Sequence, residues 1–284
     1  MPPALRRRRR RRNACFSAVA LLSLPALSPR GAGAETIVDP KPVSEWIVTL
    51  RGNAGFAPNY DGSKDLSPYL LPGLSMRRPG SPVSFGAPDE SPGLALWDNG
   101  FVKAGVTGRL RGPRHQSDYQ ELKGIHDIDW TVEAGGFAEF WSFEKLRARV
   151  ELRRGFWGHH GDVVDLYLDW VERLGPWTLT LGPRLSFADQ PYMNKFFGVS
   201  PYEALANGKV FAFTPSSGGA KSTGLTGSVT YQWNEDWATS AYAKYNRLLG
   251  DAASGPIVST LGSRNQFTFG LSASYSFRTG LLPF

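Results

Sequence analysis

Residues 266–277 read QFTFGLSASYSF, and every second residue of this stretch is apolar. The residues between them are Thr, Gly and Ser, which are small and mostly polar. A period of two is typical of a β-strand whose two faces meet different surroundings. The stretch is longer than an ordinary strand of about 5–6 residues and matches the about 9–11 residues that cross a membrane. It predicts a transmembrane strand, with Phe267 to Phe277 toward lipid and the serines toward an interior.

The same alternation recurs through the chain and predicts twelve strands. We expect them at 45–56, 66–77, 82–87, 92–97, 101–111, 129–141, 146–156, 163–173, 177–187, 222–233, 237–248 and 266–277. Helical periodicity is confined to PYEALAN at 201–207, which begins with proline. A soluble β-sandwich would also alternate, with its apolar face inward. The length of the strands argues against that alternative.

The connections between these segments alternate in length. Short turns are expected at 78–81, 98–100, 142–145, 174–176 and 234–236, and long loops at 57–65, 112–128, 188–221 and 249–265. The connection 157–162 is intermediate, and 88–91 is short where a long loop is due. Short turns on one side and long loops on the other are typical of bacterial outer-membrane barrels. We therefore predict an all-β fold, a transmembrane antiparallel up-and-down β-barrel whose last strand pairs with its first.

Tryptophan supplies a separate indication. Six of the nine tryptophans fall beside the start of the first strand or beside a short turn: Trp46, Trp97, Trp141, Trp177, Trp233 and Trp237. Amphipathic rings favour the level of the lipid headgroups, so these residues predict an aromatic girdle at one membrane interface.

Charged residues within the strands share the parity of the inward face. A charge on the lipid face costs about 2–4 kcal/mol at mid-membrane, so we place these charges in the lumen. They are Glu133, Glu139, Arg147, Arg149, Arg153, Asp165, Asp169 and Arg184. Two interpretations stay open: a salt-bridged plug that stiffens the barrel, or a polar conduit for an ion or solute. The mixture of both signs on neighbouring strands favours the plug.

The N-terminus has the three parts of a secretory signal peptide. Seven arginines, Arg6 to Arg12, precede the apolar run 14–27, and Ala32-Gly33-Ala34 supplies a small-residue cleavage site before Glu35. We expect residues 1–34 to be removed and residues 35–284 to form one barrel domain. The formal net charge of +7 belongs to this segment, because the remainder holds 24 basic and 25 acidic residues. The basic balance therefore indicates no nucleic-acid partner.

No catalytic, metal or cofactor site is indicated. The histidines His115, His126, His159 and His160 all fall in expected loops, and no nucleophile and acid accompany them at informative spacing. The stretch SSGGAKST at 216–223 lacks the glycine that a phosphate-binding loop has before its lysine. We expect no enzyme activity and no cofactor.

Several stretches resemble one protein family. They are WIVTLRGNAGFAPNYDGS (46–63), GGFAEFW (135–141), GPWTLTLGPRLSFAD (175–189), YMNKFFGVSP (192–201) and YNRLLGDAASGPIVSTLGSRNQFTFGLSASYSF (245–277). The chain is similar to the MipA/OmpV family, named for the MltA-interacting protein of Gram-negative outer membranes. One departure is the continuation RTGLLPF beyond Phe277.

The resemblance implies an outer-membrane location, with outer-membrane lipid around the barrel. It also implies a non-enzymatic scaffold that links a lytic transglycosylase and a penicillin-binding protein in peptidoglycan synthesis. Other branches of the family imply an alternative, an outer-membrane channel or a surface-response or adhesion barrel without enzyme partners. The family has no catalytic motif to transfer to this chain.

Overall fold

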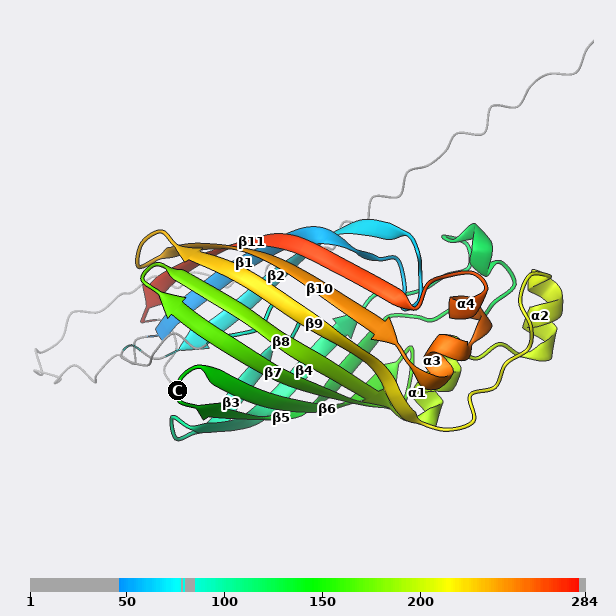
Figure 1. Cartoon of the computed structure of the whole chain (residues 1–284), viewed down its shortest axis with the longest axis horizontal. Coiled ribbons are helices and arrows are strands. Elements are labelled where there is room, and N and C mark those ends of the chain that lie inside the picture. The colour runs from blue at the N-terminus through cyan, green and yellow to red at the C-terminus, as the bar shows by residue number, and fades with distance from the viewer. Residues whose placement is uncertain (1–45, 78, 80–84, 281–284) are drawn as a thin grey trace, which may run out of the picture. The chain divides into compact units, whose positions relative to one another are not determined.

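A computed structural model of the chain describes residues 46–77, 79 and 85–280. They form one antiparallel sheet of eleven strands in the order β2-β1-β11-β10-β9-β8-β7-β6-β5-β4-β3. The strands run along the long axis and curl around an interior, while the helices gather at one end (Figure 1). The predicted signal peptide, 1–34, lies outside the described residues.

The elements follow one another with short connections at one end and long ones at the other. The strands are β1 (Trp46–Pro58), β2 (Leu66–Arg77), β3 (Gly93–Asp98), β4 (Val102–Arg111), β5 (Thr131–Ser142), β6 (Leu146–Trp157), β7 (Asp162–Leu174), β8 (Trp177–Ala188), β9 (Gly219–Gln232), β10 (Trp237–Leu248) and β11 (Asn265–Thr279). The helices are η1 (Gln120–Leu122), α1 (Gln190–Phe197), α2 (Pro201–Asn207), α3 (Gly250–Ser254) and α4 (Pro256–Ser259).

The all-β barrel fold is confirmed, and eleven of the predicted strands are found with ends within three residues of those expected. The predicted helix at 201–207 is α2. β11 pairs with β1 from Trp46–Thr279 to Phe56–Phe269, as predicted for the last and first strands. β11 continues past Phe277 to Thr279, while Phe284 lies outside the described residues.

β2 and β3 are the two edges of the sheet within the described residues. β2 and β3 are an even number of antiparallel steps apart around the sheet, so they run in the same direction. That direction is toward the end with the short connections. An antiparallel barrel closed at this seam requires one more strand between them, running the opposite way. The predicted strand 82–87 would take that place. Residues 82–84 lie outside the described residues, and Phe85–Ala87 are not in a strand.

The long connections form a folded layer over one end of the sheet, which we call the cap: residues 59–65, 112–130, 189–218 and 249–264. Its helices begin where the sequence supplies capping groups. Asp189 accepts a hydrogen bond from the backbone N–H of Tyr192 at the start of α1, and Ser200 with Glu203 forms a capping box at the start of α2. The opposite end, with the short connections, is the turn end.

The two buried apolar clusters of the described residues lie mainly in the cap. One joins α1 to α3 and α4 through Tyr192, Met193, Phe197, Ala252 and Val258. The other joins Tyr60 and the 119–128 segment to Val199 and Ile257. A soluble protein has its apolar core inside the sheet, whereas here the sheet encloses polar residues and the apolar core lies beyond its end.

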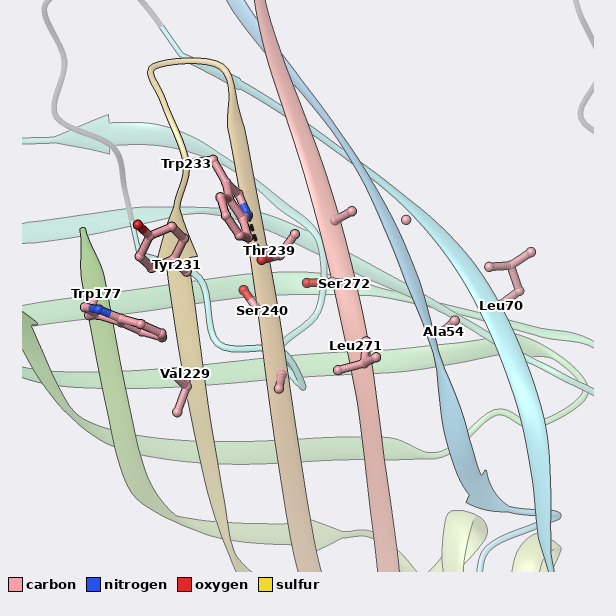
Figure 2. Close-up of a pocket in the computed structure, with 13 residues that line it drawn as sticks. Ala54, Leu70, Trp177, Val229, Tyr231, Trp233, Thr239, Ser240, Leu271 and Ser272 are labelled. Carbon is pink, nitrogen blue, oxygen red and sulfur yellow. Dashed lines mark hydrogen bonds between the residues drawn. The ribbon is translucent and has the colours of Figure 1, made fainter.

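The outer face of the sheet is apolar and exposed, as in Leu271 of β11 and Leu168 of β7. A groove of about 860 Å³ crosses strands β9, β10, β11 and β1, where small residues such as Ala54 lie between larger ones (Figure 2). Trp177, Tyr231 and Trp233 border the groove, and Trp233 Nε1 donates a hydrogen bond to Thr239 Oγ1 over 3.0 Å. This surface is suited to acyl chains. Among the described residues, no helix is long and apolar enough to cross a membrane.

The depth of the outer face in the membrane can be tested with arginine. Leu168 lies near the middle of β7, and Trp130 immediately precedes β5 at the cap side. We expect Leu168→Arg to lower the free energy of unfolding by about 2–4 kcal/mol and Trp130→Arg by about 0–1 kcal/mol, because the penalty for a charge falls toward the interface. Denaturant unfolding in lipid vesicles measures both. Equal losses would contradict the assigned depths.

Candidate functional site

The alternation of residues along each strand decides which side chains face the interior of the sheet. In β6, Arg147, Arg149, Glu151 and Arg153 are buried, while the apolar residues between them are exposed on the outside. Successive side chains of a strand point to opposite faces, so one sequence pattern places four charges inward and aliphatic groups outward.

The inward charges of β5 to β8 form a continuous network of ion pairs. Arg147 binds Glu139 (2.7 Å) and Asp169 (3.0 Å), and Arg149 binds Glu139 (3.2 Å) and Glu151 (2.9 Å). Neighbouring strands bring these groups together, since Arg147 is directly opposite Asp169 in the pairing of β6 with β7.

The network continues toward the cap. Arg153 binds Glu133 (3.0 Å) and Asp165 (2.5 Å) and also contacts Glu151. Arg184 of β8 binds Asp169 over 2.7 Å. The structure thus brings together all eight of the charges singled out in the sequence: Glu133, Glu139, Arg147, Arg149, Arg153, Asp165, Asp169 and Arg184. Their mutual pairing offsets the large penalty for removing each charge from water.

The segment 87–92 lies inside the barrel and crosses its interior. Asp89 binds Arg184 of β8 (3.1 Å) and Lys244 of β10 (3.0 Å), and its backbone oxygen accepts a hydrogen bond from Arg109 of β4 (3.0 Å). Glu90 binds Arg147 over 2.5 Å. One carboxylate of this segment therefore joins β8 to β10, two strands that do not pair with each other. The connection expected at 88–91 is held inside the barrel by these charges.

Several residues of the network were not singled out in the sequence. Glu151, Arg109 and Arg111 have the inward parity and could have been found by the same rule. Asp89 and Glu90 carry no periodic signal, and the only indication was a short connection where a long loop was due. Lys221 has the parity of the outer face, so alternation alone assigns it to lipid.

One of the eight predicted lumen charges, Glu133, is connected to the cap through shared partners. Arg111 binds Glu133 (2.5 Å) and Asp61 (3.3 Å) of the 59–65 connection. His159 Nε2 lies 3.2 Å from Glu133 Oε1, with its ring against Tyr192 and Phe196 of α1. His159 falls in the connection expected at 157–162, and the structure buries it. The cap is therefore tied to the charged wall beneath it.

The predicted girdle tryptophans all lie at the turn end, beside the ends of their strands. Trp97, Trp177, Trp233 and Trp237 are exposed on the sheet. Trp141 differs, because its position in β5 is inward: its Nε1 donates a hydrogen bond to Glu139 (2.6 Å), and its ring contacts Phe85 and Arg173. We therefore correct the prediction for Trp141, whose parity is that of the charged face and not of the lipid face. Trp46 begins β1 and is half-buried.

This chain matches a known protein family over most of its length. The family described as MltA-interacting protein MipA matches residues 52–277. The chain belongs to the MipA family. This MipA-family protein is an outer-membrane β-barrel, and it is similar to two outer-membrane proteins of vibrios. It is 33% identical to OmpV of Vibrio cholerae and 32% identical to Omp26La of Vibrio anguillarum, each over 93 residues. The matched stretch covers 33% of this chain and 34% of each relative.

Solved structures that resemble the MipA-family chain are also outer-membrane proteins. The outer membrane channel DcaP of Acinetobacter baumannii has 10% identity and a TM-score of 0.37, with 84% of this chain and 99% of that chain covered. The N-terminal β-barrel domain of Pseudomonas aeruginosa OprF has 10% identity and a TM-score of 0.28, with 62% and 96% covered. Neither likeness says what this chain binds.

The contribution of the segment 87–92 to the stability of the barrel can be tested at Asp89. Asp89→Asn keeps the shape of the side chain but leaves Arg184 and Lys244 without a shared carboxylate. We expect a loss of about 3–5 kcal/mol in the free energy of unfolding, as for one partner removed from a buried ion pair. The control is Asp98→Asn at the turn end, where a more exposed pair with Lys103 is worth at most about 1 kcal/mol. Equal losses would contradict the role given to Asp89.

The cap has an acid-sensitive contact at Glu203. Burial raises the pKa of Glu203, but hydrogen bonds from Ser200 and His126 outweigh that effect and lower the pKa to about 2. The backbone N–H of His126 lies 2.7 Å from Glu203 Oε1, and the His126 ring reaches Lys195 O. A depressed carboxyl pKa stabilises the fold above the ordinary value of 4.5, and this stabilisation is lost as the pH falls toward 2.

Hydrogen exchange of residues 199–207 measures this effect. We expect their protection to fall between about pH 4.5 and pH 2 in the unaltered protein. The fall should be much smaller in Glu203→Gln, whose protection is already low at neutral pH. Glu235→Gln, at an exposed site of the turn end, serves as the control and should follow the unaltered protein. An unchanged acid dependence in Glu203→Gln would rule out this contact as the source.

Proposed function

We propose that this protein is a non-enzymatic scaffold of the outer membrane, which presents its turn end to enzymes of peptidoglycan synthesis. The partners proposed are a lytic transglycosylase and a penicillin-binding protein. The description of the family, MltA-interacting protein, supports the first partner. The second is proposed from the resemblance alone.

The observation that carries the proposal is the filled interior. Asp89 binds both β8 and β10, Glu90 binds β6, and the cap lies over one end. A barrel of this kind offers partners its ends more readily than its lumen. Long connections face outward and short turns face the periplasm in outer-membrane barrels, so the turn end is the surface that periplasmic enzymes would meet.

One turn of this end has an unusual conformation. Phe143 and Glu144 have φ of 52° and 56°, and Phe143 is 89% exposed at the tip of the β5–β6 turn. Two-residue hairpin turns with positive φ favour Asn and Gly, and a bulky residue there is strained. Phe101 of the neighbouring turn is 68% exposed, and its backbone oxygen accepts a hydrogen bond from Trp141 N–H. A strained, exposed aromatic residue on a periplasmic turn is a reasonable contact for a protein partner.

Export is part of the proposal. We propose that residues 1–34 form a signal peptide cut between Ala34 and Glu35. The inward charges would then serve as a structural plug, and the exposed tryptophans of the turn end would lie at the periplasmic interface of the membrane.

The alternative function is a channel or a surface-response barrel without enzyme partners. The inner faces of β10 and β11 favour it, since these strands contribute Ser240, Ser272 and Ser274 and no ion pair with each other, where the opposite wall has a network of ion pairs. Steady conductance in planar bilayers, together with failure to capture either enzyme class, would replace the scaffold with this alternative.

A binding experiment on the turn end tests the scaffold. Phe143→Asn removes the ring and suits the left-handed backbone, so the barrel should fold with unchanged or slightly higher stability. We expect its affinity for a purified lytic transglycosylase to fall at least about tenfold, or about 1.4 kcal/mol. Tyr202→Asn is the matched control, because Tyr202 is 80% exposed in the cap. The scaffold proposal fails if the unaltered protein captures neither a transglycosylase nor a penicillin-binding protein.

A further inference from the structure

The wall of the lumen is divided into two halves of different charge. Strands β5 to β8 carry basic and acidic side chains that pair with one another. The other half, the five consecutive strands β2, β1, β11, β10 and β9, contains no aspartate or glutamate. Its basic residues are Arg51, Arg77, Lys221, Lys244, Arg247 and Arg278. Among the described residues, Lys244 finds its acidic partner in Asp89 of the segment 87–92.

A β-bulge turns Lys221 into this half of the interior. The pairing of β8 with β9 shifts between Ser186–Ser222 and Phe187–Ala220, so Lys221 has no partner in the register. Lys221 and Ser222 are both buried, although successive residues of a regular strand point to opposite faces. A bulge re-aims side chains in this way and is often found beside functional sites. Without it, Lys221 would face lipid.

The ammonium group of Lys221 is poorly satisfied for a buried charge. Lys221 is 8% exposed; its Nζ donates one hydrogen bond, to Tyr192 Oη over 3.3 Å, and lies 5.0 Å from the centroid of the Tyr192 ring. Within the described part of the chain, no carboxylate lies within 4.0 Å of this Nζ. An ammonium group has three N–H donors, and lysine is rarely buried without an ionic partner. The geometry therefore leaves donor capacity for a negatively charged group.

A polar cavity of about 220 Å³ lies beside this lysine, under the cap. Its lining includes Lys221, Lys244, Asp61, Asn246, Gln266 and Thr268. The Asp61 carboxylate already binds Arg111 (3.3 Å) and accepts a hydrogen bond from Tyr192 Oη (3.1 Å), so its charge is offset. Asn246 Oδ1 is buried without a hydrogen-bond partner among the described residues. The volume is several times the about 30 Å³ that one water occupies, which is enough for a small anion with its water.

We propose that this cavity binds a small free oxyanion, a carboxylate or a phosphate, with Lys221 as its principal ligand. Charge-assisted hydrogen bonds from an ammonium group to an oxyanion are about twice as strong as neutral ones. Lys244 also lines the cavity and is paired with Asp89, while the carboxylate in the lining, Asp61, is paired with Arg111, so Lys221 is the cation left to bind the anion. The cavity is too small for a lipid with its chains. The site is separate from the turn end, so its test does not depend on the scaffold.

The experiment measures binding to the full barrel in a neutral detergent. Isothermal titration with inorganic phosphate and with acetate, against chloride at the same ionic strength, gives the affinities. We expect saturable binding of at least one of the two oxyanions above the chloride background. Lys221→Met should weaken it about tenfold or more. Lys209→Met, which removes an exposed lysine of the cap, is the matched control and should bind as the unaltered protein does.

Folding is checked by the shift in electrophoretic mobility between heated and unheated samples. Lys221→Gln is the second variant, since it keeps a polar group at the bulge while it removes the charge. It should lose the oxyanion to the same degree as Lys221→Met. The proposal is overturned if the unaltered protein binds neither phosphate nor acetate, or if a folded Lys221→Gln or Lys221→Met protein binds them with unchanged affinity.

Discussion

The structure depends on the need of each backbone N–H and C=O group for a hydrogen-bond partner in hydrocarbon. Lipid supplies none, so the strands must supply one another. This constraint also acts between distant parts of the chain. The pairing of β11 with β1 joins residues that lie more than two hundred positions apart in the sequence. In a closed barrel, each strand has one face toward lipid and one toward the interior. Apolar residues therefore meet lipid, while polar residues meet each other.

The second constraint follows from the first. Charges assigned to the interior cannot remain unpaired there, since burial of a lone ion is very unfavourable. The wall from β5 to β8 satisfies this by alternating arginine with glutamate and aspartate across neighbouring strands. Strands β2, β1, β11, β10 and β9 have no acidic residues of their own, and Asp89 of the segment 87–92 supplies the partner for Lys244. The segment 87–92 is thus an electrostatic requirement of the barrel as well as a physical obstruction within it.

These features bear on function in different ways at the two ends. The cap contains the apolar cores that a soluble protein would have in its centre, and Arg111 and His159 connect it to the charged wall. The turn end has no comparable layer in the described residues, and instead exposes aromatic side chains such as Phe143. The proposed protein partner and the proposed oxyanion would therefore bind at opposite ends of one molecule, and one role does not exclude the other.

The sequence by itself determined eleven of the strands, their order and the inward face of the paired charges, because the period of two and the limits on buried charge are local rules. It therefore predicted the eight charges from Glu133 to Arg184, and it would have yielded Glu151 by the same rule. The tertiary structure alone decided the place of Asp89 and Glu90, the inward direction of Lys221 and the burial of His159. The positions of a non-periodic segment, a bulge and a cap depend on contacts with residues distant in the chain. Alternation along one strand does not indicate those contacts.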